Sequence, residues 1–214
     1  MNWKAQLIEA GRQMLGKGLT VETWGNLSLR DPDTGLIYLT PSAMPYDTIQ
    51  ESDVVVMTPD GAVAEGTRKP TVEAGMHLRI LRARPEINAI IHTHPLYSLV
   101  FGVQHREIPP IIDEAAQVLG GTVRVADYAL PGTEALAENA QKALGSRGMA
   151  CLLANHGAVC LGRDMDQAFR VGTVLEMTAH IYQMALATGT PQIISGEHVA
   201  YMKDFMDNHY GQDR

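Results

Sequence analysis

Two histidines in the segment 89–95 are the residues whose types and spacing point most directly to chemistry. The segment reads Ala-Ile-Ile-His-Thr-His-Pro, an apolar run that ends in two histidines separated by one residue. Side chains alternate between the faces of a strand, so we expect His92 and His94 to point the same way from one rigid edge. Two imidazoles fixed in this way suit a transition-metal ion, which needs further donors from elsewhere in the chain. From the spacing alone, an edge strand with two solvated imidazoles is an equally good interpretation.

His156 shifts the balance towards a metal site. It lies between two apolar runs and is followed by Gly157, a combination typical of a turn that brings one side chain into a cleft. Three histidines on rigid elements with an open coordination position are the pattern of a catalytic zinc site. Glu73, near an expected helix start, is a candidate carboxylate ligand or general base. Its alternative role is to complement the helix dipole.

The other histidines are weaker candidates. His77 follows Glu73 by four residues on the same expected helix face, from which it could approach the site. The remaining four are expected to be surface or hydrogen-bonded residues, as isolated histidines usually are: His105, His180, His198 and His209.

Length and composition indicate an ordinary globular protein. The chain has 214 residues, of which 45% are hydrophobic and 19% charged, which suits one domain of generous size. The formal charge is −7 and the longest basic run is Arg68-Lys69, so we expect neither nucleic acid nor an anionic membrane as a partner. Cys151 and Cys160 are expected to be free, buried thiols. The sequence shows no signal-peptide pattern and no apolar stretch of membrane-spanning length, so we expect a cytoplasmic protein.

The periodicity of apolar residues predicts a mixture of helices and strands. Helices are expected over 2–17, 71–84, 95–103, 113–119, 133–144, 164–188 and 197–208. Strands are expected over 24–30, 36–40, 53–58, 87–92, 123–126, 149–153 and 158–161. The irregular alternation, with hairpins, favours one sheet covered by helices over a strict βαβ repeat. We expect Thr71 to cap its helix and the tail from about 209 to 214 to be mobile.

A series of short motifs carries a resemblance to a known family. In chain order they are Thr23-x-Gly25-Asn26-x-Ser28, Thr40-Pro41-Ser42, Lys69-Pro70-Thr71-x-Glu73, His92-x-His94-Pro95, Asp127-Tyr128, Gly132-Thr133 and Asn155-His156-Gly157. Together they resemble the class II aldolase/adducin family, and within it the L-fuculose-phosphate aldolases. The resemblance implies that residues 1–214 form a single α/β/α layered domain with a central, mostly antiparallel sheet. It also implies one divalent ion per subunit, Zn²⁺ or else Mn²⁺ or Co²⁺, and a homotetramer with sites at subunit interfaces.

The resemblance also implies a reaction. Such aldolases cleave a ketose 1-phosphate, such as L-fuculose 1-phosphate or a deoxy-pentulose 1-phosphate, into dihydroxyacetone phosphate and an aldehyde. His92, His94 and His156 match the metal ligands of the family, and Glu73 matches an acid/base that also ligates the metal when substrate is absent. A carboxylate beside a Lewis-acidic ion suits abstraction of a proton next to a carbonyl. We expect partial desolvation to raise the basicity of Glu73.

Phosphate recognition is expected in three loops that match the family's phosphate-binding positions. They contribute Gly25 with Asn26, Ser42 with the Ala43 amide, and Thr71 with the Val72 amide. Ala43 stands where the aldolases usually have glycine, and Val72 where they have a second serine. Loss of a hydroxyl that bonded a charged phosphate would cost about 1–3 kcal/mol, while the backbone donors are retained.

A third departure concerns the proton donor. Where the aldolases have a tyrosine that reaches the neighbouring subunit's site, this chain has Asp113, followed by Glu114. Acidic residues here resemble those of the family's dehydratases and decarboxylases; the simpler alternative is a negatively charged helix start. The C-terminal tyrosine of the aldolases is matched by Tyr210.

Four functions follow from these residues. The first is an aldolase acting on a short sugar phosphate, and the second a dehydratase or decarboxylase of the same family. A 4-epimerase is less favoured, because the family's epimerases have aspartate at the position that matches Glu73. A non-catalytic adducin-like protein is least favoured because the metal ligands are all present.

Overall fold

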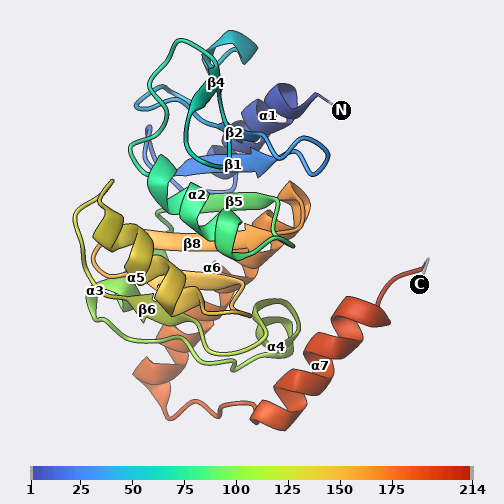
Figure 1. The fold of residues 1–214 in the computed structure, drawn as a ribbon. Helices are drawn as coiled ribbons and strands as arrows, with labels where there is room; N and C mark the ends of the chain where they lie inside the picture. Colours follow the sequence, from blue (N-terminus) through green and yellow to red (C-terminus); the bar gives the residue numbers. More distant parts are fainter. Residues whose placement is uncertain (1, 213–214) are drawn as a thin grey trace.

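A single eight-stranded sheet organises the chain in the computed structural model, which describes residues 2–212 (Figure 1). Its strand order is β4-β3-β2-β1-β5-β8-β7-β6, and every pairing is antiparallel except the parallel pair β6 and β7. The strands are β1 (Asn26–Arg30), β2 (Ile37–Leu39), β3 (Val55–Met57), β4 (Val63–Glu65), β5 (Ala89–Thr93), β6 (Arg124–Ala126), β7 (Ala150–Leu153) and β8 (Gly157–Gly162). The expected mixed fold with a mostly antiparallel sheet is therefore confirmed.

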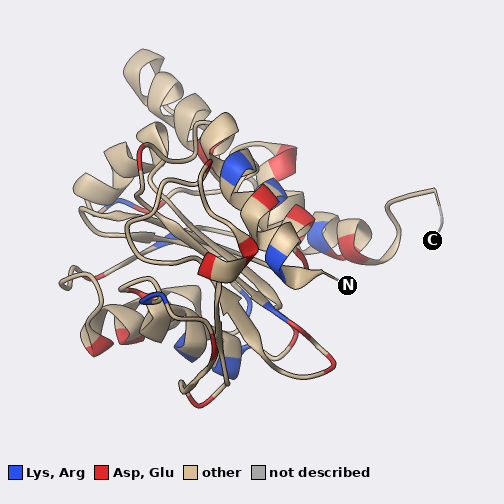
Figure 2. Cartoon of the chain, turned by 90° about the horizontal axis from the view of Figure 1, so that it is seen from above, with Lys and Arg blue, Asp and Glu red and all other residues tan. Residues whose placement is uncertain are grey.

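Helices cover both faces of this sheet, which Figure 2 shows close to edge-on. Helices α2 and α5 pack against each other, while α6 packs along β5 and β8 and is flanked by α3. The helices are α1 (Trp3–Gly16), α2 (Ala74–Ala83), α3 (Leu96–Val103), α4 (Asp113–Leu119), α5 (Glu134–Leu144), α6 (Met165–Thr188) and α7 (Gly196–Asn208), with a 3₁₀ turn at Glu51–Asp53. The layers form because each amphipathic helix has an apolar side that must be buried against another element, here the sheet or a neighbouring helix.

The middle of the sheet holds the most deeply buried strands. β5, β7 and β8 are buried at every residue because helices cover both of their faces. Strands of this kind read as nearly continuous apolar runs, as these do. β5 lies between β1 and β8, so it is an interior strand. The alternative of an edge strand carrying two solvated imidazoles is therefore wrong.

Two details differ from the sequence-based expectations, and one expectation is untested. Helix α2 begins at Ala74 with Glu73 as its N-cap, so Thr71 lies before the cap. β4 was not expected, because its three residues are all exposed and show no alternation of buried and exposed side chains. The mobility expected for the tail from about 209 stays a prediction: residues 213–214 lie outside the described part, and the amide of His209 donates to the Phe205 carbonyl at the end of α7.

The cysteines and the helices bear on two further expectations. Cys151 and Cys160 are free and buried, as expected, and burial raises the pKa of Cys151 to about 12. Among the described residues, no helix combines the length and the apolar character needed to cross a membrane.

Candidate metal centre and active site

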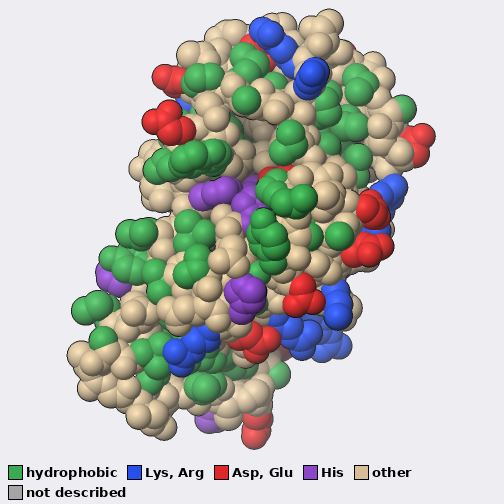
Figure 3. Space-filling view, turned by 90° about the vertical axis from the view of Figure 1, so that its left-hand side faces the viewer, with side chains coloured by type: hydrophobic (Ala, Val, Ile, Leu, Met, Phe, Trp, Pro, Cys, Tyr) green, Lys and Arg blue, Asp and Glu red, His purple; other side chains and the backbone are tan. Residues whose placement is uncertain are grey.

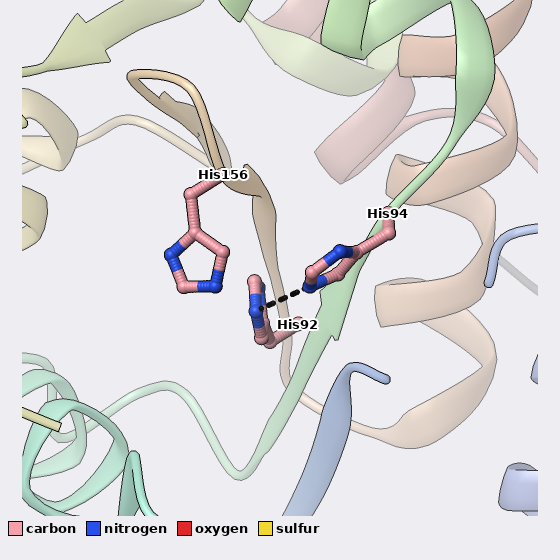
Figure 4. A group of neighbouring side chains, drawn as sticks. All are labelled: His92, His94 and His156. Atoms are coloured by element: carbon pink, nitrogen blue, oxygen red, sulfur yellow. Dashed lines mark hydrogen bonds between the residues drawn. The ribbon is translucent and has the colours of Figure 1, made fainter. Parts of the chain in front are cut away.

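The three histidines singled out in the sequence converge on one point (Figure 4). His92 lies in β5, where it pairs with Asn26 of β1 and Val159 of β8, and its side chain is fully buried. His94 follows the strand, and its Nε2 atom lies 3.1 Å from Nε2 of His92. One ring nitrogen from each of His92, His94 and His156 lies within 4.8 Å of the others. The structure thus brings together residues that lie far apart in the sequence.

The turn between β7 and β8 brings His156 to this point. Asn155 adopts a positive φ of 56°, which is tolerated by asparagine better than by most residues. A Cβ atom on Gly157 would lie 2.4 Å from the Thr93 carbonyl oxygen and 3.0 Å from Cε1 of His92. Only glycine therefore lets the β7–β8 turn approach β5 closely enough to complete the histidine cluster.

The protonation of the imidazoles suits metal binding. The Nδ1–H of His92 donates to the carbonyl of Ala158 at 3.0 Å, because a carbonyl can only accept, and this leaves Nε2 as the ring nitrogen directed at the other two histidines. Burial lowers the pKa of His94 to about 3, and burial likewise lowers the pKa of His156. These two rings are therefore neutral near pH 7, the form in which histidine binds a metal.

Glu73 brings a carboxylate to the same point. Its side chain is buried, with Oε2 3.1 Å from Nε2 of His92 and Oε1 3.6 Å from Nε2 of His156. Within the described residues, Oε1 of Glu73 and Nδ1 of His156 are buried atoms with no hydrogen-bond partner. A buried, unpartnered carboxylate oxygen beside imidazole lone pairs is costly without a compensating cation. The donor set of three nitrogens and one carboxylate therefore fits a divalent transition-metal ion.

The pKa of Glu73 reflects two opposing causes. Burial raises the pKa of this carboxyl group, but its contacts with His92, Asn26 and His156 lower the pKa by more than burial raises it. The net direction is therefore downward. The expected increase in basicity through desolvation is thus outweighed while Glu73 stays in contact with these neighbours. Glu73 is consequently ionised and able to accept a proton.

Gly25 and Asn26 lie directly against the metal centre. Gly25 has a φ of +73°, and a Cβ atom there would lie 2.5 Å from the carbonyl oxygen of His92. The hydroxyl of buried Tyr46, a residue that sequence reasoning missed, donates to the Gly25 carbonyl at 2.7 Å and holds the loop. The side-chain amide of Asn26 donates to Oε2 of Glu73 at 2.8 Å. The expected phosphate contact of Asn26 stays a prediction, since its amide here is engaged by Glu73.

The other two expected phosphate loops lie side by side. The Ser42 amide donates to the Lys69 carbonyl at 3.0 Å and the Thr71 amide donates to the Thr40 carbonyl at 3.1 Å. Ala43 adopts a φ of 56°, the left-handed conformation that favours glycine. The side chain of Val72 is 65% exposed. These contacts join the two loops at the N-terminal end of α2, next to Glu73.

The mouth of the site is partly apolar. The indole of Trp24 stacks on the ring of His94, with ring centres 6.4 Å apart, and remains 57% exposed. Figure 3 shows histidine side chains in a hollow of the surface, with hydrophobic side chains on either side. The hollow gives a small molecule access to the imidazoles.

Comparison with known proteins decides the family. The family model described as "Class II Aldolase and Adducin N-terminal domain" matches residues 5–183. The chain belongs to this family.

Several aldolases of this family are similar to the chain over nearly its whole length. It is 34% identical over 209 residues to a 5-deoxy-D-ribulose 1-phosphate aldolase of Bacillus thuringiensis, with 98% of this chain and 97% of the relative covered. It is 32% identical to the L-fuculose phosphate aldolase of Escherichia coli K12, with 91% and 89% covered. The solved structure of an L-fuculose 1-phosphate aldolase superposes with a TM-score of 0.93 at 38% identity, covering 96% of each chain. Class II aldolases use a divalent metal, and the histidine cluster of this chain is suited to one.

The three expected proton donors, Asp113, Glu114 and Tyr210, lie at the start of α4 and just after α7. Asp113 and Glu114 are exposed and begin α4, where they place negative charge at the helix start. Glu114 and Tyr210 line one pocket together with Arg163 and Arg170, and none of the three histidines lines it. The pocket that Glu114 and Tyr210 share is therefore separate from the histidine cluster. Their participation in a neighbouring subunit's site stays a prediction.

The remaining histidines behave as isolated histidines usually do. His105 bonds the side chain of Asn155 at 2.7 Å, and His180 stacks on Tyr97 with ring centres 3.7 Å apart. His198 and His209 are exposed. His77 is fully buried and contacts Asn26, so it approaches the site through a neighbour.

Sequence reasoning also missed Glu176 of α6. Its carboxylate accepts hydrogen bonds from the Tyr97 amide, the Ser98 amide and the Ser98 hydroxyl at 2.7–2.8 Å. These bonds hold the start of α3, immediately after His94. The N-cap residue of α3 is Pro95, whose side chain makes no capping hydrogen bond. No local pattern signals this role, because Glu176 lies in another helix far along the chain.

Proposed function

We propose that this protein is a metal-dependent aldolase that cleaves a short ketose 1-phosphate into dihydroxyacetone phosphate and an aldehyde. The observation that carries the proposal is the buried, ionised carboxylate of Glu73 beside the three imidazoles of His92, His94 and His156. The names of the relatives support the substrate class, since they are aldolases of 5-deoxyribulose 1-phosphate and fuculose phosphate.

The histidines His92, His94 and His156, with Glu73 in the substrate-free state, would hold the ion, which we propose to be Zn²⁺. When bound, such an ion supplies Lewis acidity towards the substrate carbonyl and hydroxyl oxygens. Mn²⁺ and Co²⁺ are the alternatives, because a site of imidazoles and one carboxylate accepts each of them according to availability.

Glu73 is the acid/base of the reaction. In the direction of synthesis, its carboxylate removes a proton from C3 of dihydroxyacetone phosphate, and C3 then bonds to the aldehyde carbon. In the direction of cleavage, the C3–C4 bond breaks, the C4 hydroxyl loses its proton and Glu73 returns a proton to C3. A positioned carboxylate typically contributes about 10²–10⁴-fold to the rate of such a transfer.

The phosphate group of the substrate would be held by backbone amides and hydroxyls at the start of α2. We assign this role to Ser42 with the amide of Ala43, to Thr71 with the amide of Val72, and to the Gly25-Asn26 loop. Neither the Ala43 nor the Val72 amide donates a hydrogen bond within the described part of the chain. Free amides at a helix start are suited to an anion.

The second proton transfer, at the C4 hydroxyl, needs a further group. We propose that Asp113, Glu114 or Tyr210 supplies it from a neighbouring subunit of a homotetramer, because Glu114 and Tyr210 line a pocket that includes none of the three histidines of their own chain. We also propose that residues 1–214 act as one domain, in the cytoplasm. The aldolase names of the relatives do not favour the dehydratase or decarboxylase alternative.

A panel of ketose 1-phosphates tests the proposal. Purified protein is stripped of metal, reloaded with Zn²⁺, Mn²⁺ or Co²⁺, and assayed for dihydroxyacetone phosphate with 5-deoxyribulose, fuculose and methylthioribulose 1-phosphates. Release of triose phosphate that depends on the ion is the expected result. No triose phosphate from any member would overturn the proposal, and release of water or carbon dioxide would revive the alternative.

A further inference from the structure

Four buried side chains form a continuous hydrogen-bonded series that ends at Glu73. The Ser28 hydroxyl lies 2.7 Å from Nδ1 of His77, and Nε2 of His77 lies 2.6 Å from Oδ1 of Asn26. The Asn26 amide nitrogen lies 2.8 Å from Oε2 of Glu73. All four side chains are at most 5% exposed. The series therefore lies away from water.

The spacing of the residues explains why the series forms. Asn26 and Ser28 are two apart in β1, so both point to the same face of the sheet. Glu73 and His77 are separated by one helical turn at the start of α2, so they lie on the same side of that helix. The packing of α2 over β1 thus places the two pairs opposite each other.

The hydrogen bond between Asn26 and Glu73 fixes the direction of the other bonds in the series. The NH₂ group of Asn26 donates to Oε2 of Glu73, which leaves the carbonyl oxygen of Asn26 facing His77. That oxygen also only accepts, so Nε2 of His77 carries the hydrogen. Burial lowers the pKa of His77 to about 3, which keeps the ring neutral, so Nδ1 accepts a hydrogen bond from Ser28.

We propose that His77 and Ser28 are positioning residues that hold the Asn26 amide towards Glu73. The amide then occupies Oε2 of Glu73, while Oε1 has no hydrogen-bond partner in the described part of the structure. Oε1 is thereby the oxygen that carries the substrate proton. This inference rests on the proposed function of Glu73 as acid/base, but the direction of the hydrogen bonds does not depend on it.

Loss of the His77 hydrogen would release the Asn26 amide. Asn26 could then turn its carbonyl oxygen towards Glu73, where two acceptors repel each other, and both carboxylate oxygens would become free to rotate. A mispositioned carboxylate transfers protons more slowly, although the three histidines still bind the ion.

Substitutions of the two positioning residues test the inference. Ser28→Ala removes the hydrogen donated to Nδ1, and His77→Phe removes both ring nitrogens. His77→Gln is the rescue variant, because its amide can donate to Asn26 and accept from Ser28. Thr178→Val is the matched control, since it removes a buried hydroxyl that donates to the Val174 carbonyl within α6.

The first measurement is the tautomer of His77 in the zinc-loaded protein without substrate, from long-range ¹H–¹⁵N NMR correlations. Hydrogen on Nε2 is expected, and hydrogen on Nδ1 would overturn the inference. This result is independent of any enzymatic activity. A wild type that shows the Nε2 tautomer and yet has no aldolase activity would count against the proposed function alone.

The second measurement is exchange of the C3 proton of dihydroxyacetone phosphate with deuterium from the solvent, a step that needs Glu73 and no aldehyde. We expect Ser28→Ala and His77→Phe to slow it about tenfold or more, the rate equivalent of about 1.4 kcal/mol. His77→Gln and Thr178→Val should exchange at rates near that of the wild type, and all variants should bind as much zinc as the wild type. Unchanged exchange in Ser28→Ala and His77→Phe would overturn the inference, as would equal losses in His77→Gln and His77→Phe.

Discussion

Oε2 of Glu73 lies 3.1 Å from Nε2 of His92, although one residue caps a helix and the other lies in the middle of a strand. Both side chains are buried, so the carboxylate and the imidazole share one small volume that excludes bulk water. A cation placed between them would satisfy the carboxylate and the imidazoles of His92, His94 and His156, which makes the contact an indicator of a metal centre.

Substitution of Glu73 should separate catalysis from metal binding. Glu73→Gln keeps the shape of the side chain but removes the charge and the basic oxygen. We expect kcat to fall by about 10²–10⁴-fold, the usual contribution of a positioned acid/base. Zinc content, measured by mass spectrometry, should stay close to one ion per chain because the three histidines remain. The exposed Glu134, which pairs with Arg79, offers the control Glu134→Gln. A Glu73→Gln enzyme as active as the control would contradict the assignment.

Removal of the metal should abolish activity reversibly. A chelator is expected to inactivate the protein, and added Zn²⁺, Mn²⁺ or Co²⁺ should restore turnover. Loss of a residue that only orients a metal ligand costs about 10–100-fold in affinity. His94→Ala removes a ligand itself, so it should weaken zinc binding by more than that. His198→Ala, a change at an exposed histidine of α7, is the control and should bind zinc as the wild type does. Full activity after exhaustive chelation would rule out a metal-dependent reaction.

Gly157 should be essential for the geometry of the centre. A methyl group there would collide with the Thr93 carbonyl and crowd His92 and His94, with contacts of 2.4, 3.0 and 3.2 Å. We expect Gly157→Ala to lower zinc affinity about 10–100-fold, the usual cost of disturbing the groups that orient metal ligands. Isothermal titration calorimetry measures the change. Gly196→Ala is the control, because a Cβ atom at Gly196 would meet nothing within 4 Å. Equal zinc affinity in both variants would show that the β7–β8 turn tolerates a side chain.

Glu176 should stabilise both the fold and the metal centre. Glu176→Gln replaces one accepting oxygen by an NH₂ group that faces the donors of Tyr97 and Ser98. An unsatisfied donor at a helix start costs about 1–3 kcal/mol, so the free energy of unfolding in urea should fall by that amount. Zinc affinity should fall as well, since α3 begins just after His94. Glu138→Gln, at an exposed position of α5, should change neither quantity. Wild-type stability of Glu176→Gln would mean that the α3 start does not need the carboxylate.

The metal-free protein should lose stability on mild acidification. Burial lowers the pKa of His77 and of His94 to about 3, against an unperturbed value of 6.5. Because the unfolded chain binds protons that the folded chain resists, the stabilising contribution is fully present above about pH 6.5 and is lost as pH falls from there towards 3. Each such group accounts for at most about 1.4 kcal/mol per pH unit. Glu73, whose pKa is lowered, adds a loss of the same sign below about pH 4.3.

Urea unfolding between pH 7.5 and pH 5.5 measures this dependence. His77→Gln should show a smaller decrease in the free energy of unfolding than the wild type, and Thr178→Val should show the same decrease as the wild type. A wild type whose stability is constant over this range would contradict the burial of neutral imidazoles.

Local patterns in the sequence determined most of the secondary structure and the nature of the metal centre. The apolar run before His92 predicted a strand, which the structure shows to be buried, and the helix predicted over Asp113–Leu119 is α4. β4 escaped because an exposed edge strand has no periodic apolar signal. The histidines were identifiable because their type and spacing suit metal ligands and the ordered motifs around them resemble those of a metal-dependent family.

Only the tertiary structure decided how the remaining groups are used. It placed His92 on an interior strand, engaged the Asn26 amide with Glu73, and lowered the pKa of Glu73 where desolvation alone would have raised it. It also showed Glu176 at the start of α3 and kept Glu114 and Tyr210 away from the histidines of their own chain. These relationships depend on contacts between distant segments, and such contacts leave no local periodicity in the sequence. The residue types thus determined which chemistry is available, while packing decided which atoms meet and in which protonation state.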